Sequence, residues 1–286
     1  MSVDVRDEPR IEVLDDPEAC SDAAAHAIAR ALVDAVDRRG RADWATTGGS
    51  TPVGIYQVLA AAPHRDEVPW DRVHVWWGDD RYVPRDHPLS NVLPFDQVLL
   101  SASARGGLSG SGADAADVEI GDEPGIWMSP TQVHAPPMTR AIAVGIGLEG
   151  AVADYEAALR AAGLPVAESG LPAFDVVLLG IGPDGHLLSV FPGSPLLDDA
   201  DTWVAAVPAP THVEPHVPRL SLNPGILEAA GTVVVVVHGA GKAGILASVL
   251  GPERDERQWP AQLARRGNTT WFVDRAAAAD LADLPG

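Results

Sequence analysis

Cysteine is almost absent from this 286-residue chain, which contains only Cys20. One cysteine cannot form a disulfide within the chain, and such a composition suits a reducing compartment. The N-terminal segment is charged and lacks an apolar stretch of signal-peptide length. Even the valine run at residues 233–237 is far too short to cross a bilayer. We therefore expect a soluble, cytoplasmic protein that does not bind membranes.

Positive charge is also scarce, because 20 basic residues face 40 acidic ones and give a net charge of −20. A nucleic-acid partner is disfavoured, since binding one requires a basic face. Lys242 is the only lysine among the basic residues. This bias indicates that a compact ammonium is needed at Lys242, with chance as the alternative.

Strand and helix patterns alternate along the chain and predict an α/β fold with a mostly parallel sheet. The expected strands are residues 10–14, 42–46, 72–77, 174–179, 202–207, 219–222, 232–237 and 269–273. The expected helices are residues 17–39, a segment after 52, one ending near 100, one around 148–159, one after 242 and an Ala-rich segment after 273. No linker divides the chain, so we expect residues 1–286 to form a single α/β catalytic domain. Residues 101–140, rich in Gly, Ser, Ala and Asp, are expected to form a surface insertion.

The most informative stretch, residues 174–193, joins an apolar run to a glycine-rich turn. The run predicts a buried parallel strand. The turn contains Gly180, Gly182, Asp184, Gly185 and His186. Turns at the carboxyl ends of parallel strands are where such sheets bind ligands. An acid and an imidazole there indicate a site, although a turn with a capping Asp and an exposed His fits the pattern equally well.

A second glycine-rich turn comprises Gly48, Gly49, Ser50, Thr51 and Pro52 and connects an expected strand to an expected helix. Glycines let backbone N–H groups approach an anion, Ser or Thr caps the helix, and Pro suits its first turn. The helix dipole adds partial positive charge, so the loop is suited to phosphate. It is not a Walker loop, because no Gly-Lys-Ser/Thr follows. An ordinary capped turn is the alternative.

Asp79, Asp80 and Arg81 follow another expected strand. The two carboxylates could orient sugar hydroxyls, while Arg81 contacts phosphate or a developing oxyanion. In so acidic a chain, this pattern by itself favours a solvent-exposed acidic turn.

Other motifs are weaker. Residues 180–185 match the dinucleotide pattern G-x-G-x-x-G, but Pro183 and His186 disturb the helix start and no acid ends the next strand. His212 and His216 are spaced like metal ligands, but Pro215 favours a loop and no H-E-x-x-H motif occurs. The chain also lacks the G-x-S-x-G nucleophile elbow. We therefore expect no metal site.

Four stretches together resemble the 6-phosphogluconolactonase family. They are GGSTP at 48–52, DDRYVP at 79–84 followed by Ser90-Asn91, LGIGPDGHLLSVFPG at 179–193, and PRLSLN at 218–223 with GAGK at 239–242. Their order and spacing agree over most of the chain, and 179–193 is the most specific. Asp80 departs from the family pattern, where Glu is common, and Leu187-Leu188 stand where Thr-Ala is common.

The resemblance implies a Rossmann-like sheet between helices, of the type shared by glucosamine-6-phosphate deaminases and ribose-phosphate isomerases. It implies hydrolysis of 6-phospho-D-glucono-1,5-lactone to 6-phosphogluconate in the pentose phosphate pathway, without a cofactor. The partner is then a small phosphorylated sugar lactone, and the protein a monomer or small homo-oligomer.

The same resemblance implies roles for individual residues. The phosphate would bind the loop at 48–51, with Arg219 and Lys242 supplying its counter-charge. His186 would act as general base on water, and Asp184 would orient the imidazole or hold a hydroxyl. Arg81 or loop N–H groups would stabilise the oxyanion, and Asp79 would contact the sugar.

Three alternatives remain. A nicotinamide-dependent oxidoreductase depends on the G-x-G-x-x-G match alone, and a second alternative is a glucosamine-6-phosphate deaminase or another sugar-phosphate isomerase. In the related deaminases, the fifth residue after the histidine is a Glu that helps to open an amino sugar, whereas this chain has Phe191. A lactonase does not need that carboxylate, so Phe191 favours the lactonase. The third alternative is a non-catalytic sugar-phosphate-binding module, but the acidic chain shows no basic helix-turn-helix segment.

Overall fold

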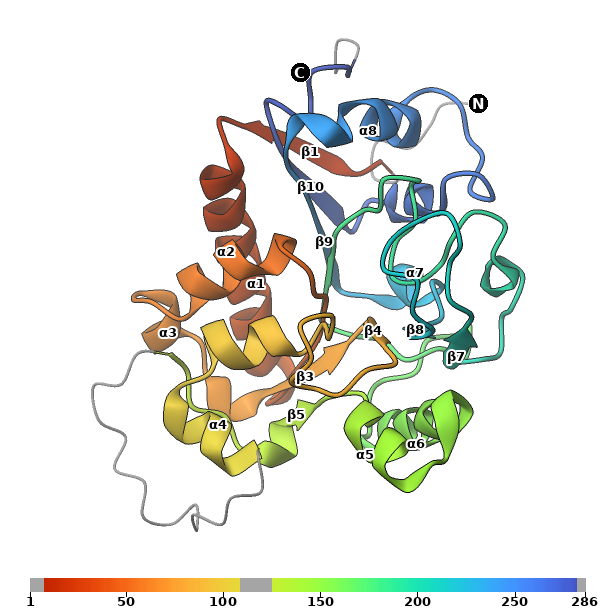
Figure 1. Cartoon of the computed structure of the whole chain (residues 1–286). Coiled ribbons are helices and arrows are strands. Elements are labelled where there is room, and N and C mark those ends of the chain that lie inside the picture. The colour runs from red at the N-terminus through yellow and green to blue at the C-terminus, as the bar shows by residue number, and fades with distance from the viewer. Residues whose placement is uncertain (1–7, 109–124, 282–286) are drawn as a thin grey trace.

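Seven parallel strands form the central sheet of the protein, which confirms the expected α/β class (Figure 1). The computed structural model describes residues 8–108 and 125–281. The strands are β1 (Arg10–Leu14), β2 (Ala42–Thr46), β3 (Val73–Trp77), β5 (Val133–His134), β6 (Val176–Leu179), β9 (Thr232–Val237) and β10 (Thr269–Asp274). Their order is β1-β10-β9-β6-β2-β3-β5.

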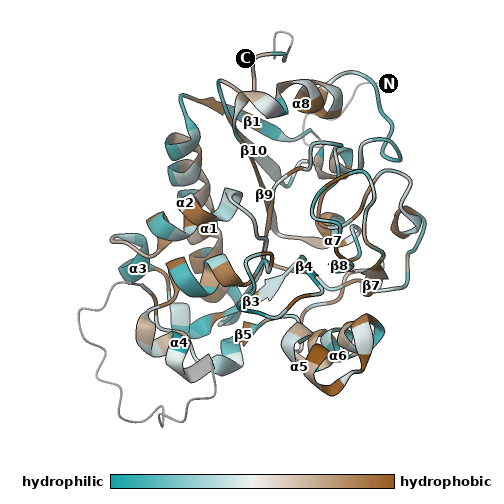
Figure 2. Cartoon of the chain, viewed as in Figure 1, coloured by the Kyte–Doolittle hydropathy of each residue, from teal (hydrophilic) through white to brown (hydrophobic). Residues whose placement is uncertain are grey.

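Both faces of this sheet are buried, because alternate residues of each strand enter separate hydrophobic cores. In β6, Val176 and Leu178 join one core, and Val177 and Leu179 join the other. β9, with the sequence TVVVVV, is hydrophobic along its length, as Figure 2 shows. The continuous apolar run of β9 therefore predicted a buried central strand from the sequence.

Helices cover the two faces. The first core packs against α1 (Pro17–Arg39) and α2 (Thr51–Leu59), and the second against α5 (Met138–Val144), α6 (Gly147–Ala161), α7 (Ile226–Ala229) and α8 (Ala243–Leu250). The remaining short helices are α3 (His64–Glu67) and α4 (Ala102–Leu108). No helix in the described ranges is long and apolar enough to span a bilayer.

Helix α1 has the bounds that its sequence predicts, because both of its ends carry strong local signals. The Asp16 side chain accepts a hydrogen bond from Ala19 N at 2.9 Å, which caps the helix start. Gly40 follows the last turn with φ of 75°, a left-handed conformation that glycine adopts easily.

A buried ion-pair cluster holds the amino ends of the central strands. Asp43, in β2, is fully buried and accepts hydrogen bonds from Arg39 Nη2 at 2.7 Å and from Arg41 Nη2 at 2.6 Å. Trp76 Nε1 also donates to Asp43, at 3.1 Å. Burial alone would raise the pKa of Asp43, but the bonds from Arg41 and Arg39 hold that pKa below its ordinary value. The charge of Asp43 is thus fully paired.

Three segments form a separate antiparallel sheet with the order β4-β8-β7. They are β4 (Asp79–Arg81), β7 (Val204–Val207) and β8 (Arg219–Leu222). Two strands expected from the sequence, at 202–207 and 219–222, therefore lie outside the parallel sheet. The pairing of β4 with β8 places Arg81 directly opposite Arg219. This small sheet thus brings two cationic residues together that are far apart in the sequence.

The expected surface insertion at 101–140 differs in part from the structure. Residues 109–124 lie outside the described residues, but Ile126 bridges to Leu100, and Met128 is fully buried. Val133 and His134 then form β5, which extends the parallel sheet beside β3. Residues 126–140 therefore belong to the packed fold, because their few apolar side chains fill the sheet edge.

Two expected helices are also different. The segment that was expected to be helical up to residue 100 contains a π-helix at Phe95–Leu99. The Ala-rich segment after β10 was expected to be helical, but residues 275–280 form consecutive turns. Asp274 Oδ1 accepts a hydrogen bond from Ala277 N at 2.7 Å, and Ala277 is fully buried. So short an alanine segment has no helical stability of its own to oppose these contacts.

The chain changes direction between β2 and β6, which are neighbours at the centre of the sheet. It leaves β2 through α2 on one face and leaves β6 toward α7 on the other. At such a switch point the loops separate and leave a crevice at the carboxyl ends of the strands. The fold therefore predicts a ligand site between the loops after β2 and β6.

Candidate active site

A cavity of about 140 Å³ lies at this switch point. Six residues that were predicted from the sequence line it, namely Gly48, Thr51, Asp79, Arg81, His186 and Arg219. Two more of the predicted residues, Asp184 and Lys242, hydrogen-bond to residues of the lining. Gly49 and Ser50 belong to the same loop as Gly48 but lie outside the lining. The structure thus gathers eight of the ten predicted residues at one place.

His186 and Asp184 form a hydrogen-bonded pair in the turn after β6. His186 Nδ1 lies 2.5 Å from Asp184 Oδ1, and its backbone N–H donates to the same oxygen at 3.2 Å. No helix follows the turn in residues 180–193, so Asp184 is not a helix cap. Both side chains are largely buried, with exposures of 14% for His186 and 17% for Asp184. The alternative interpretation of this turn, with a capping Asp and an exposed His, is therefore wrong.

Glycine is required beside this pair. A Cβ on Gly182 would lie 2.0 Å from His186 Nδ1 and 2.7 Å from Asp184 Oδ1. Gly185 has φ of 82°, the left-handed region that side chains disfavour. The G-x-G-x-x-G spacing is thus explained by the packing of the histidine, and the turn does not open a helix as a dinucleotide site would.

His212 is a residue of the site that the sequence did not identify. Its Nε2 lies 2.8 Å from Asp184 Oδ2, so two imidazoles hold the two oxygens of one carboxylate. Burial alone would raise the pKa of Asp184, but hydrogen bonds from His186 and His212 lower it well below its ordinary value. Asp184 is therefore an anion that orients His186.

The spacing of His212 and His216 had suggested metal ligands, but these imidazoles have separate partners. His216 Nδ1 hydrogen-bonds to Pro210 O at 2.7 Å, while His212 contacts Asp184. Within residues 8–108 and 125–281, no group of three or more potential ligands could hold a metal ion. The position of His212 shortly before Arg219 could have indicated a residue of the site. Its contact with Asp184 could not be predicted, because the two residues are far apart in the sequence.

Arg219 brings a buried positive charge to the cavity. Its residue exposure is 2%, its Nη2 donates to Pro215 O at 3.1 Å, and its Nε has no hydrogen-bond partner. The guanidinium carbon lies 5.1 Å from the centre of the Phe191 ring, so the two side chains make a cation–π contact. Burial lowers the pKa of Arg219, and the carboxylate of Asp79 partly offsets this. A buried guanidinium with an unpaired nitrogen favours an anionic ligand.

Asp79 and Asp80 are buried rather than solvent-exposed, so the expectation of an acidic surface turn is wrong. Asp79 Oδ2 accepts a hydrogen bond from Ser189 Oγ at 2.6 Å. Asp80 Oδ1 accepts from the backbone N–H groups of Asn91 at 2.7 Å and of Arg81 at 2.8 Å. Burial raises the pKa of Asp80 to about 7, although the two backbone donors oppose this change. Asp80 therefore organises the loop without facing the cavity.

Arg81, the last residue of β4, also lines the cavity. Its Nη1 donates to Leu89 O at 2.8 Å, and its buried Nε has no partner. Since β4 pairs with β8, Arg81 and Arg219 line one cavity together, and each has a buried guanidinium Nε without a hydrogen-bond partner. Two such donors are suited to an oxyanion or a phosphate.

The loop after β2 packs closely against its neighbours. A Cβ on Gly48 would lie 2.2 Å from Asn91 Oδ1, and one on Gly180 would lie 3.3 Å from Thr51 Oγ1. Helix α2 begins at Thr51, and the Ser50 side chain makes no capping bond, contrary to the expected cap. The start of the helix, with its partial positive charge, is thus left for a ligand at Thr51.

Lys242 lies at the edge of the cavity. Its Nζ donates to Ile181 O at 2.7 Å, and Ile181 lines the cavity. Burial lowers the pKa of Lys242, while the negative charge of Asp184 raises it. The only lysine of the chain is therefore held against the turn that carries His186.

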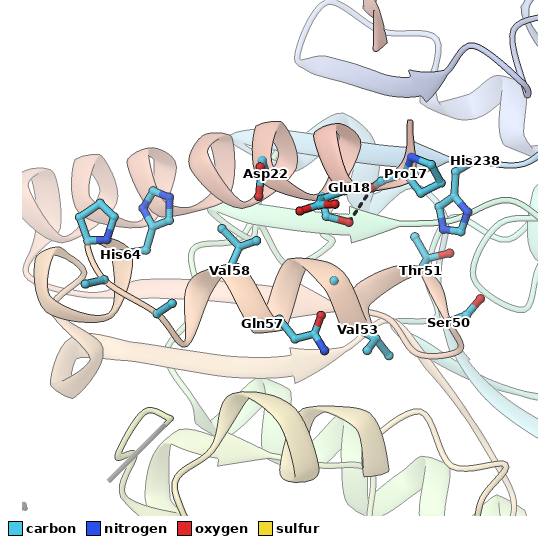
Figure 3. A pocket seen from close by; sticks show the side chains of 15 residues that line it. Pro17, Glu18, Asp22, Ser50, Thr51, Val53, Gln57, Val58, His64 and His238 are labelled. Atoms are coloured by element: carbon cyan, nitrogen blue, oxygen red, sulfur yellow. Dashed lines mark hydrogen bonds between the residues drawn. The ribbon is translucent and has the colours of Figure 1, made fainter. Parts of the chain in front are cut away.

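A larger pocket of about 690 Å³ lies between α1 and α2 (Figure 3). Ser50, Thr51 and His238 stand at one end of it, and Glu18 and Asp22 line its wall on α1. Among the described residues that line it, none is Lys or Arg. This acidic pocket is therefore unsuited to phosphate, despite its size, and the smaller cavity is the candidate active site.

Comparison with known proteins identifies the family of this chain. The family model described as "Glucosamine-6-phosphate isomerases/6-phosphogluconolactonase" matches residues 15–271. The chain belongs to this family. It is 34% identical over 278 residues to the 6-phosphogluconolactonase of Streptomyces coelicolor, covering 96% of this chain and 95% of that protein. It is 32% identical over 272 residues to that of Mycobacterium tuberculosis, covering 95% and 98% of the two chains. The resemblance drawn from the motifs is confirmed.

Solved structures of the family share the fold. The 6-phosphogluconolactonase of Trypanosoma brucei superposes with a TM-score of 0.75 and 25% identity, over 96% of this chain and all of that one. A monomeric glucosamine-6-phosphate deaminase superposes with a TM-score of 0.70 at 18% identity, which shows the shared fold alone. The expected Rossmann-like architecture of this superfamily is therefore confirmed.

Two of the three residues that depart from the family motifs lie outside the cavity lining. Asp80 is 1% exposed, and Leu187 is also 1% exposed, so neither offers a group to a ligand. Leu188 lines the cavity and has φ of 52°, and its Cδ2 would lie 2.5 Å from a Cβ on Gly78. Leu188 thus contributes an apolar side chain to the cavity wall, whereas Leu187, which stands where Thr is common, is outside the lining.

Proposed function

We propose that this protein hydrolyses 6-phospho-D-glucono-1,5-lactone to 6-phosphogluconate, the lactonase step of the pentose phosphate pathway. One observation supports the proposal above the others. A histidine oriented by a carboxylate and two guanidinium groups with unpaired nitrogens share one small cavity. Family membership and full-length relatives that are 6-phosphogluconolactonases support the same conclusion.

The phosphate binds at the cationic side of the cavity. Arg219 supplies a buried guanidinium, Lys242 an ammonium at the edge, and the start of α2 at Thr51 the backbone N–H groups. In a chain of net charge −20, these groups must overcome the surrounding negative field locally. The scarcity of basic groups elsewhere thereby favours binding at this one place.

His186 performs the chemistry. Because Asp184 is an anion that accepts the Nδ1 proton, Nε2 is the nitrogen that is free to take a proton from water. The water attacks the lactone carbonyl, and the resulting His186 cation then protonates the ring oxygen as it leaves. General-base catalysis of this kind contributes about 10²- to 10⁴-fold in rate.

Two further groups assist this step. Arg81 stabilises the oxyanion, since its unpaired Nε lies in the same cavity as His186. His212 binds the second oxygen of Asp184 and keeps the carboxylate in the orientation that holds His186. The charge on Asp184 offsets the positive charge that His186 acquires during the reaction.

Phe191 argues against amino-sugar deamination. Its ring centre lies 4.6 Å from that of His186, and the side chain is buried, with 8% exposure. An apolar ring there supplies no carboxylate for opening an amino-sugar ring. The packing favours ester hydrolysis, which requires only a base and a proton donor.

The decisive experiment is a pH-stat assay on freshly prepared 6-phosphogluconolactone, corrected for spontaneous hydrolysis, with glucosamine 6-phosphate tested in parallel. We expect rapid acid release from the lactone and no ammonia from the amino sugar. His186→Ala should lose most of kcat with KM little changed. Ammonia release by the wild-type protein, or full kcat in the His186 variant, would refute the proposed reaction or the proposed base respectively.

A further inference from the structure

The amide of Asn91 is held in one orientation at the wall of the cavity. Its Nδ2 donates to the backbone oxygen of Asp79 at 2.8 Å and to the Asp79 carboxylate at 3.0 Å. A backbone carbonyl can only accept a hydrogen bond, so the NH₂ group must face Asp79. The amide oxygen of Asn91 therefore points in the other direction.

That oxygen, Asn91 Oδ1, is buried and has no hydrogen-bond partner. The whole residue is 2% exposed, and it lines the cavity that contains His186 and Arg219. A buried acceptor without a donor costs about 1–3 kcal/mol. Such a group in a binding cavity is explained if the ligand supplies the missing donor.

The other unpaired groups of the cavity have the opposite character. The buried side-chain atoms without partners in the lining are Arg81 Nε, Arg219 Nε and Asn91 Oδ1. The two guanidinium nitrogens donate and are suited to phosphate or carbonyl oxygen. The carboxylate of Asp79 is already bound by Asn91 and by Ser189 Oγ. Asn91 Oδ1 is thus an acceptor that remains for a donor on the ligand.

We propose that Asn91 Oδ1 accepts a hydrogen bond from a hydroxyl group of the sugar and makes the site select a fully hydroxylated lactone over a deoxy one. This inference depends on the proposed function for the identity of the ligand. The side chain of Asn91 joins Asp79 to the cavity. A site built to bond a hydroxyl discriminates strongly against an analogue that lacks it, because the acceptor is then left unpaired.

The test combines a change in the protein with a change in the substrate and asks whether their effects on kcat/KM are independent. We would measure kcat/KM for the parent lactone and its 2-, 3- and 4-deoxy analogues, with the wild-type protein and with Asn91→Ala. The wild type should disfavour one deoxy analogue by roughly 10- to 100-fold. In Asn91→Ala that ratio should fall toward one, because the parent lactone loses the bond and the analogue has none to lose.

Ser189→Ala is the matched control. It removes the other hydrogen bond to the Asp79 carboxylate and leaves Asn91 Oδ1 in place. It should therefore affect all lactones alike and preserve the discrimination of the wild type. If Asn91→Ala also slows all lactones equally, then Asn91 acts on the attacking water or on the fold, and the proposal is wrong.

Binding measurements separate this proposal from the proposed reaction. Dissociation constants of 6-phosphogluconate and its deoxy forms can be measured by calorimetry whether or not the protein turns over the lactone. Selectivity that depends on Asn91 would support the hydroxyl contact even if hydrolysis were not observed. Should Asn91→Ala fail to fold, a crystal structure of the wild type with 6-phosphogluconate decides. A sugar hydroxyl within 3.2 Å of Oδ1 supports the contact, and an Oδ1 without one refutes it.

Discussion

Gly182→Ala tests the proposed base without altering any catalytic group. The new Cβ would lie 2.0 Å from His186 Nδ1, whereas ordinary contacts begin at 3.4 Å. The imidazole must therefore move by about 1.4 Å. Such a shift breaks the 2.5 Å contact with Asp184, which orients the ring. The backbone conformation of Gly182 does not exclude alanine, since its φ is not positive.

The size of the effect follows from what the imidazole contributes. Removing general-base catalysis costs about 10²- to 10⁴-fold, and a displacement of about 1 Å can cost 10²-fold. We expect kcat of Gly182→Ala to fall by at least about 10²-fold. Stability should change little, because the clash is relieved by rotation of a side chain, and replacing glycine by alanine at an allowed φ contributes about 0.4–1 kcal/mol.

The assay combines kcat from the pH-stat with thermal unfolding followed by circular dichroism. Gly244→Ala is the control, since its Cβ would meet no atom within 4 Å and it lies at an exposed position of helix α8. It should keep wild-type kcat and be slightly stabilised. In a His186→Ala background, Gly182→Ala should cause no further loss. A Gly182 variant with kcat within about threefold of wild type, or a further loss in that background, would refute the reasoning.

Three further predictions concern charged groups. Burial raises the pKa of Asp80 to about 7 from its ordinary 3.8, so between these pH values the folded state retains a proton that the unfolded state has lost. The free energy of unfolding therefore falls as pH rises through this range. Because Asn does not titrate, the free energy of unfolding of Asp80→Asn should rise relative to that of the wild type by on the order of 1 kcal/mol per pH unit between about pH 4 and 7. Urea titrations measure this difference, and a difference independent of pH would contradict the prediction. Asp43→Ala should lower the free energy of unfolding by about 1–3 kcal/mol, because buried Trp76 Nε1 loses its acceptor and Arg41 loses its carboxylate, while Arg39 keeps Asp175. It should leave kcat unchanged at the opposite end of the sheet, whereas a variant of wild-type stability would show that the cluster is dispensable. Arg219→Ala and Lys242→Ala should mainly raise KM for the lactone in steady-state kinetics, and an unchanged KM in both would place the phosphate elsewhere.

Local sequence patterns were sufficient for most of the parallel sheet. Within that sheet, the bounds of β1, β2 and β9 agree with the expected ranges. Strands buried on both faces consist of apolar runs, and glycines or prolines end them, so each strand can be identified from its own residues. By contrast β5 has only two residues, and its place beside β3 depends on a neighbour distant in the sequence.

The residues of the candidate site also fall into those that sequence patterns identified and those that they did not. Motifs identified His186, Asp184, Arg81 and the loop at 48–51, because each comes shortly after a strand of the parallel sheet along the chain. Sequence patterns did not identify His212 as a partner of Asp184, since that contact depends on how the loop before β8 folds back. They also placed the acids of 79–80 in solvent, because burial is a property of the packed molecule.

The amino-acid sequence by itself determined the class of fold, most strands and the turns that carry the chemistry, since each of these depends on residues adjacent in the chain. Only the tertiary structure decided that Arg81 pairs with Arg219 across an antiparallel pair, and that Asn91, which lines their cavity, keeps a buried amide oxygen without a partner. The physical reason is that pairing, burial and hydrogen-bond satisfaction depend on which distant segments become neighbours, and no local pattern encodes that choice.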